Sequence, residues 1–115
     1  VLCPVALQGP SLQGLKTFFR YLQSAQKLNL DLRLEYILPT MFDRRTRQSH
    51  KILEQLKKYF SRQVCDPIHY NVRLSEAPSF GQTIFEYEAR AQGASDYKCL
   101  IERIINHGDR QEEIT

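Results

Sequence analysis

Short apolar runs alternate with amphipathic stretches along this chain, and this alternation limits its fold more than any other feature. Residues 1–7, 32–38 and 63–70 predict three strands, of which the second could extend to Thr40 and the third is weakened by Pro67. Strands separated by helices pair in parallel, through right-handed crossovers. The sequence therefore predicts an α/β fold in which helices flank a mostly parallel sheet.

The intervening stretches carry apolar residues three or four positions apart, the spacing of one helical face. Residues 12–28 predict the first helix, with Ser11 as its N-cap. The second helix has an apolar stripe made of Ile52, Leu53, Leu56, Tyr59 and Phe60. A final helix begins near Ala94 and should end at Gly108, which leaves residues 109–115 as a flexible acidic tail. Residues 1–108 are thus expected to form a single domain.

Length and composition fit a globular chain. The sequence has 115 residues, 42% apolar and 25% charged, so one ordered domain is expected. Because it has neither an apolar run of roughly 20 residues nor a secretory start, we expect a cytoplasmic protein without a membrane segment. Val1 lies inside an apolar run and Met41 is the sole methionine, which suggests a piece of a longer protein.

The residue types that bind metals are scattered. The three cysteines are Cys3, Cys65 and Cys99, which form no CxxC pair, and the three histidines are equally dispersed. This spacing favours neither a disulfide framework nor a zinc site, and we expect no metal ligands.

Basic residues concentrate in the middle of the chain. From Arg44 to Arg73 there are eight basic residues and two acidic ones, a local charge of +6. Arg47 and Lys51 share one helical face, whereas Arg45 and Arg73 lie in loops that follow strands. Such loops meet at the carboxyl edge of a parallel sheet. The patch could bind a nucleic-acid backbone, although a solvated helix face is the simpler reading of the charge run alone.

The sequence offers little for catalysis. None of its five glycines is followed by Lys-Ser or Lys-Thr, so a phosphate-binding loop is absent and this chain alone cannot hydrolyse a nucleoside triphosphate. Ser75 and Ser79 lack a nucleophile-elbow setting. Asp43, which precedes two arginines, is better explained as a loop cap or an arginine's partner than as a catalytic carboxylate.

Two segments resemble a known family. "ILPTMFDRRT", followed after a helix by "NVRLSEAPSFGQTIFEYEARAQGASDY", resembles the C-terminal half of the ParA/Soj partition ATPases. The similarity spans nearly the whole chain, but "IHYN" stands where the family has "IPRN", so His69 and Tyr70 are departures. Gln8, where the family often has Glu, and Arg47, where it often has Asn, also depart from the pattern.

The resemblance implies a three-layer, P-loop NTPase-like fold, present here as its C-terminal portion. It implies an ATPase that uses ATP and Mg²⁺, dimerises with ATP, binds DNA non-specifically on the nucleoid and is stimulated by a ParB-type partner. Its phosphate loop and magnesium ligands would precede this chain. Arg45 and Arg73 match the family's DNA-contacting arginines, while Asn71 and Thr40 match its adenine side.

Two alternatives stay open. The chain could be a nucleic-acid-binding module that acts without ATP, or a structural or dimerising α/β domain whose basic face is only solvated. Salt-sensitive DNA binding would separate these two, and dependence on ATP would separate both from a partition ATPase of plasmids or chromosomes.

Overall fold

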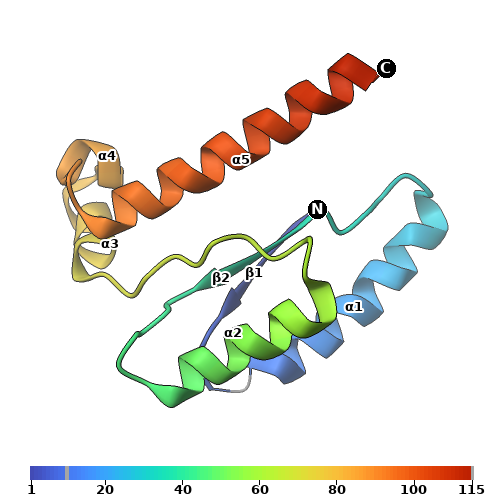
Figure 1. The fold of residues 1–115 in the computed structure, drawn as a ribbon, viewed down its shortest axis with the longest axis horizontal. Coiled ribbons are helices and arrows are strands. Elements are labelled where there is room, and N and C mark those ends of the chain that lie inside the picture. The colour runs from blue at the N-terminus through green and yellow to red at the C-terminus, as the bar shows by residue number, and fades with distance from the viewer. Residues whose placement is uncertain (10, 115) are drawn as a thin grey trace. The chain divides into compact units, whose positions relative to one another are not determined.

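The computed structural model describes residues 1–9 and 11–114, and within them the side chains of residues 1–9 and 13–107. The chain divides into two compact units, Val1–Pro67 and Ile68–Thr115. Figure 1 shows both units, and each is described by itself below.

The first unit is built on two parallel strands. β1 (Leu2–Ala6) pairs with β2 (Tyr36–Thr40), with Leu2 opposite Tyr36 and Ala6 opposite Thr40. The helix α1 (Ser11–Leu28) connects them, as the sequence predicted. β2 begins at Tyr36 rather than at residue 32, although the preceding backbone still bonds to Val1: the Val1 amino group donates to the carbonyl of Arg33 at 2.8 Å, and the Glu35 N–H donates to the carbonyl of Val1 at 3.0 Å. The parallel α/β prediction is confirmed.

The predicted third strand is reduced to isolated bridges, at Val64 and at His69. Ile37 pairs in parallel with Val64; its N–H donates to Gln63 and its carbonyl accepts from Cys65, at 2.8 and 2.9 Å. Pro67 follows two residues later and has no backbone N–H, so the ladder cannot continue through it. The prediction of a strand over residues 63–70 was therefore wrong in extent; the bridge at Val64 lies beside β2.

Both helices of the first unit cover the same face of the sheet. α2 (Arg47–Phe60) packs Ile52, Leu53 and Leu56 into a core with alternate residues of β1 and with Leu15 of α1. Phe19 of α1 stacks on Phe60 of α2, with ring centroids 5.3 Å apart. Of the apolar stripe predicted for α2, Ile52, Leu53 and Leu56 are buried and Phe60 is partly buried. Tyr59 is 72% exposed, so its place in the buried face was predicted wrongly.

The second unit contains short helices followed by a long one. α3 (Val72–Glu76), the 3₁₀ helix η1 (Ala77–Phe80) and α4 (Ile84–Tyr87) precede α5 (Gln92–Ile114). α5 continues through Gly108, so the predicted helix end there was wrong. An interior glycine costs a helix only about 1 kcal/mol relative to alanine, which neighbouring residues can offset. The predicted division at residue 108 into domain and tail stays a prediction, and the predicted Ser11 cap lies outside the described side chains.

Local capping explains why residues 71–87 are ordered. The Asn71 side chain accepts from the Arg73 N–H at the start of α3, and Thr83 and Glu86 form a reciprocal capping box on α4. Gly81 adopts φ 65°, a left-handed conformation that suits glycine, and closes η1. Residues 71–87 are therefore a series of capped turns. Across the part of the chain that the structure describes, no helix has the length and apolarity needed to span a membrane.

Gly93 supplies a test of the packing between α3 and α5. A Cβ at Gly93 would lie 2.5 Å from Cγ of Leu74, whereas a Cβ at Gly14 of α1 would meet nothing within 4 Å. We expect Gly93→Ala to lower the free energy of unfolding by about 1–3 kcal/mol through overpacking. The matched Gly14→Ala should raise it by roughly 0.5–1 kcal/mol. Urea unfolding of both variants measures this, and equal effects would contradict the packing.

Candidate nucleic-acid interface

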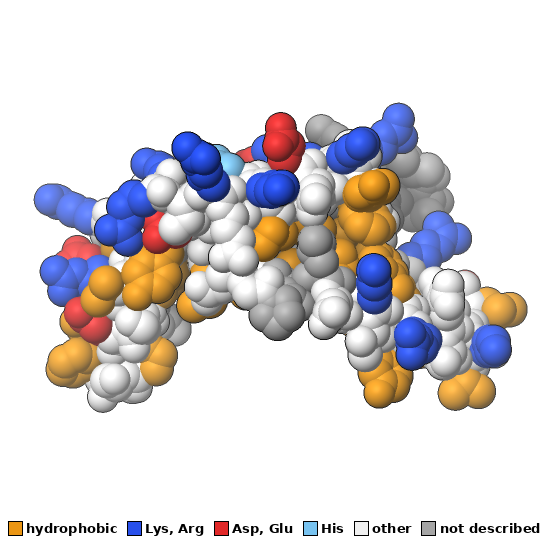
Figure 2. Space-filling view, turned by 90° about the horizontal axis from the view of Figure 1, so that it is seen from below, with side chains coloured by type: hydrophobic (Ala, Val, Ile, Leu, Met, Phe, Trp, Pro, Cys, Tyr) orange, Lys and Arg blue, Asp and Glu red, His pale blue; other side chains and the backbone are white. Residues whose placement is uncertain are grey.

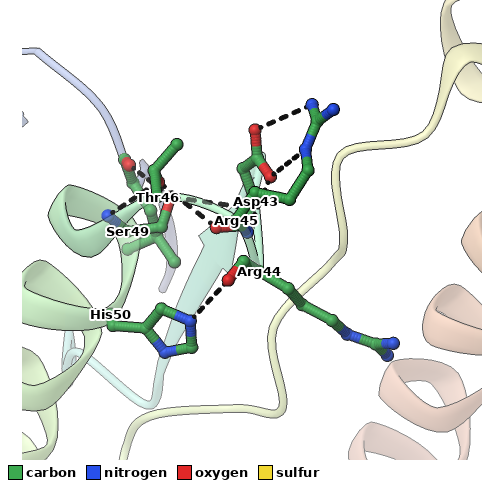
Figure 3. A network of polar contacts seen from close by, with 7 residues as sticks. Asp43, Arg44, Arg45, Thr46, Ser49 and His50 are labelled. Carbon is green, nitrogen blue, oxygen red and sulfur yellow. Dashed lines mark hydrogen bonds and ion pairs between the residues drawn. The ribbon is translucent and has the colours of Figure 1, made fainter.

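The loop between β2 and α2 is organised by Asp43. Its Oδ1 accepts from the backbone N–H of Arg45 at 3.0 Å and from Arg45 Nε at 3.1 Å, while Oδ2 accepts from Nη2 at 3.2 Å (Figure 3). These bonds, above all the side-chain bond to Arg45, hold the pKa of Asp43 below its usual value. Asp43 is thus both the loop cap and the arginine's partner that the sequence suggested.

Arg45, the first predicted DNA contact, extends into solvent. Its side chain is 84% exposed, despite its ion pair with Asp43. The neighbouring Arg44 contributes its carbonyl, which accepts a hydrogen bond of 2.9 Å from Nε2 of His50 (Figure 3). This bond connects the loop to the first turn of α2. A guanidinium held on a short, internally bonded loop has lost part of its conformational freedom before any ligand arrives.

Ser49 fastens the loop to the core. Its side chain is buried; the hydroxyl donates to the carbonyl of Leu7 at 3.0 Å and accepts from the N–H of Asp43 at 3.2 Å. The N–H of Ser49 donates to the Thr46 hydroxyl, which caps α2. One buried hydroxyl therefore joins the residue after β1, the Asp43 loop and the second helix. Sequence reasoning missed it, because a serine inside a basic helix gives no signal of burial.

The outer face of α2 carries the basic residues predicted to touch DNA. Arg47, Lys51 and Lys58 are exposed, and they project opposite the buried Ile52 and Leu56. Figure 2 shows a face of the molecule on which Lys and Arg side chains outnumber Asp and Glu. The structure therefore brings Arg45, Arg47 and Lys51 together within the first unit, around the start of α2.

Arg73, the remaining predicted DNA contact, lies in the second unit at the start of α3. Its Nη1 donates to Oε2 of Glu76 at 3.0 Å, and the same oxygen accepts from the Tyr87 hydroxyl at 2.6 Å. The hydrogen bond from Tyr87 and then that from Arg73 keep the pKa of Glu76 low, and the bond to Glu76 raises the pKa of Arg73. Sequence reasoning missed Tyr87, which is eleven residues from Glu76 in sequence.

The two residues predicted for the adenine side belong to different units. Thr40 ends β2, where its carbonyl accepts from the N–H of Leu7 at 2.9 Å. Asn71 uses its amide oxygen to cap α3, which leaves the amide nitrogen as the group suited to donate to a base.

His69, one of the departures from the family motif, has a defined partner. The carboxylate of Asp96 accepts from the His69 backbone N–H at 2.8 Å and from its Nδ1 at 3.0 Å, and also from Gln92 at 2.9 Å. This cluster connects the beginning of the second unit to the first turn of α5. Among the described side chains, those of residues 1–9 and 13–107, no group of three or more potential ligands could hold a metal ion.

The first unit is an α/β structure with a basic, loop-and-helix surface, and comparison with known proteins specifies its family. No protein-family model matches the chain. It is 40% identical over 110 residues to the sporulation initiation inhibitor protein Soj of Bacillus subtilis, covering 94% of this chain and 44% of that protein. It is 40% identical over 102 residues to the chromosome partitioning protein ParA of Myxococcus xanthus, covering 87% and 36%.

A third relative, the chromosome-partitioning ATPase Soj of Thermus thermophilus, is 37% identical over 107 residues and matches 91% of this chain. The chain belongs to the Soj/ParA family, as its motifs predicted. It spans less than half the length of these relatives: 44, 36 and 43%.

The role of Ser49 can be tested by stability. Removing its hydroxyl in Ser49→Ala leaves the carbonyl of Leu7 and the N–H of Asp43 without this partner, so we expect a loss of about 1–3 kcal/mol in the free energy of unfolding. Ser24→Ala, whose exposed hydroxyl bonds only within α1, should change it by less than about 0.5 kcal/mol. Denaturant unfolding compares them, and similar losses in both would contradict the assignment.

Proposed function

We propose that this chain forms part of the DNA-binding surface of a ParA-type partition ATPase. The observation that carries the proposal is the coincidence of family membership with the exposed arginines: Arg45 and Arg73 match DNA-contacting motif positions, and both are solvent-exposed. Arg47 and Lys51 extend the surface around Arg45. These side chains would contact phosphates rather than base edges, because they belong to a charged surface. Binding would therefore be independent of DNA sequence.

The full-length protein would use ATP and Mg²⁺, dimerise with ATP and respond to a ParB-type partner on the nucleoid of the cytoplasm. Names of the relatives include a chromosome-partitioning ATPase, which supports this assignment. Asn71 and Thr40 would contact the adenine side. The phosphate-binding residues are not part of this sequence, so hydrolysis requires segments beyond those present here.

The DNA assignment predicts uniform, salt-dependent losses. In the full-length protein, Arg45→Ala or Arg73→Ala should weaken binding to duplexes of different sequence by similar factors. Each should reduce the slope of log K against log salt by about 1, because one phosphate contact disappears. Lys27→Ala, at the far end of α1, removes the same charge and should leave the slope unchanged.

A fluorescence-anisotropy titration at several salt concentrations, with and without ATP and Mg²⁺, makes this measurement. Tight non-specific binding that depends on ATP supports the partition-ATPase role. Binding indifferent to ATP would instead indicate a plain nucleic-acid module. If both arginine variants retained the native slope, the assigned DNA contacts would be wrong.

Asn71 permits a separate test of the adenine side. Asn71→Asp retains an oxygen that can cap α3 but replaces the amide nitrogen, so the fold should persist while ATP binding weakens by about tenfold, the effect of losing one hydrogen bond to the base. Isothermal titration with ATP measures the affinity, and unfolding by urea verifies that the cap is intact. Unchanged ATP affinity would remove Asn71 from the proposed site.

A further inference from the structure

Glu76 is bonded in a way that bears directly on Arg73. A single carboxylate oxygen, Oε2, receives hydrogen bonds from Nη1 of Arg73 and from the hydroxyl of Tyr87. The Arg73 side chain is 56% exposed and that of Glu76 is 34% exposed, so the pair lies at the surface where a ligand could reach it. All three residues belong to the second unit.

We propose that Glu76 and Tyr87 form an intramolecular latch that holds Arg73 and lowers the affinity of this surface for a nucleic-acid backbone. The latch rests on the proposed function, because it requires Arg73 to contact phosphate. Carboxylate and phosphate oxygens bind a guanidinium through the same N–H donors. A phosphate that approaches Nη1 therefore competes with Glu76, and Glu76 also repels it.

The latch is preorganised by the packing around Tyr87. Its ring stacks on Phe80 with centroids 5.2 Å apart, and α4, which carries Tyr87, begins with the Thr83–Glu86 capping box. Asn71 caps α3, which carries Arg73 and Glu76. The hydroxyl of Tyr87 therefore meets the carboxylate from a fixed position. A glutamate carboxylate is ionised at neutral pH, and the hydrogen bonds from Tyr87 and Arg73 lower the pKa of Glu76 further, so the latch is charged under the conditions of DNA binding.

The ion pair between Asp43 and Arg45 differs from that between Glu76 and Arg73 in whether the carboxylate also binds the backbone. Asp43 also accepts from the backbone N–H of Arg45, so its carboxylate helps to build the loop. Oε2 of Glu76, by contrast, receives both of its bonds from side chains. Arg73 can therefore leave Glu76 without any rearrangement of backbone hydrogen bonds. This makes the Glu76 contact suited to exchange with a ligand.

Removal of the latch should strengthen binding. In the full-length protein, Glu76→Gln should bind a fluorescein-labelled duplex of mixed sequence about two- to fivefold more tightly than the unmodified protein, the range expected for an exposed ion pair. Tyr87→Phe keeps the stacking ring and removes the hydroxyl that orients Glu76, so it should produce a smaller gain. Glu102→Gln, an exposed position on α5, makes the same change in charge and should have less effect than Glu76→Gln.

The dependence on Arg73 separates the latch from the DNA site itself. The gain from Glu76→Gln should vanish when it is introduced into Arg73→Ala, because the latch then has nothing to hold. Arg73→Ala that weakens binding, together with Glu76→Gln that adds no affinity or no more than Glu102→Gln, overturns the latch and leaves the DNA site standing. Arg73→Ala without any effect overturns both. A gain that persists in the double variant reduces Glu76 to general repulsion and also overturns the latch.

Discussion

The hydroxyl of Ser49 is the contact on which the basic surface of the first unit depends. It lies in a buried position, donates to the chain just after β1 and accepts from the loop just after β2. Those two segments also carry the buried side chains of Leu7 and Phe42, which pack in the same core as Ile52 and Leu56 of α2. A buried hydroxyl with both of its bonds satisfied fixes geometry in a way that non-directional apolar packing does not. The placement of Asp43, and through it of Arg45, follows from this contact.

Each of the two arginines that match the family motifs is bonded to a carboxylate within three residues of it. Exposed ion pairs contribute little to stability, typically about 0–1 kcal/mol, so such pairs are poor candidates for holding a fold together. They are better suited to restricting where a charge can lie. A surface built from arginines that are paired with carboxylates holds its positive charges in a limited set of positions. An anionic ligand that binds such an arginine must replace its carboxylate partner. Weak, adjustable affinity is the expected property of a non-specific DNA surface arranged in this way.

Periodicity was sufficient to predict the helices of the first unit and their buried faces, because Leu15, Ile52 and Leu56 repeat at helical spacing and are buried as expected. It also predicted the parallel strand pair. It indicated that Pro67 would weaken the third strand, but it did not predict that only isolated bridges, such as that between Val64 and Ile37, would remain.

Side-chain partnerships separated by many residues were beyond sequence reasoning. The link from Glu76 to Tyr87 crosses a turn formed by η1 and Gly81, and the link from Ser49 to Leu7 crosses two elements. Neither leaves a periodic trace. The sequence did suggest Asp43 as a loop cap or as an arginine's partner, and the structure pairs it with Arg45. The contacts with DNA and ATP stay predictions.

The departure at His69 shows how a change in a family motif can be accommodated locally. A proline at this position would present no backbone N–H, whereas histidine brings a backbone N–H and a ring N–H into a half-buried setting. Both are satisfied by Asp96, whose side chain is only 9% exposed and which also accepts from Gln92. Without a carboxylate at this place, the two N–H groups of the histidine would lack acceptors, at a cost of about 1–3 kcal/mol for each buried group. Because the complementary carboxylate is present, the segment that leads to Asn71 and Arg73 keeps a defined attachment to α5, and the altered motif still positions the residues that follow it.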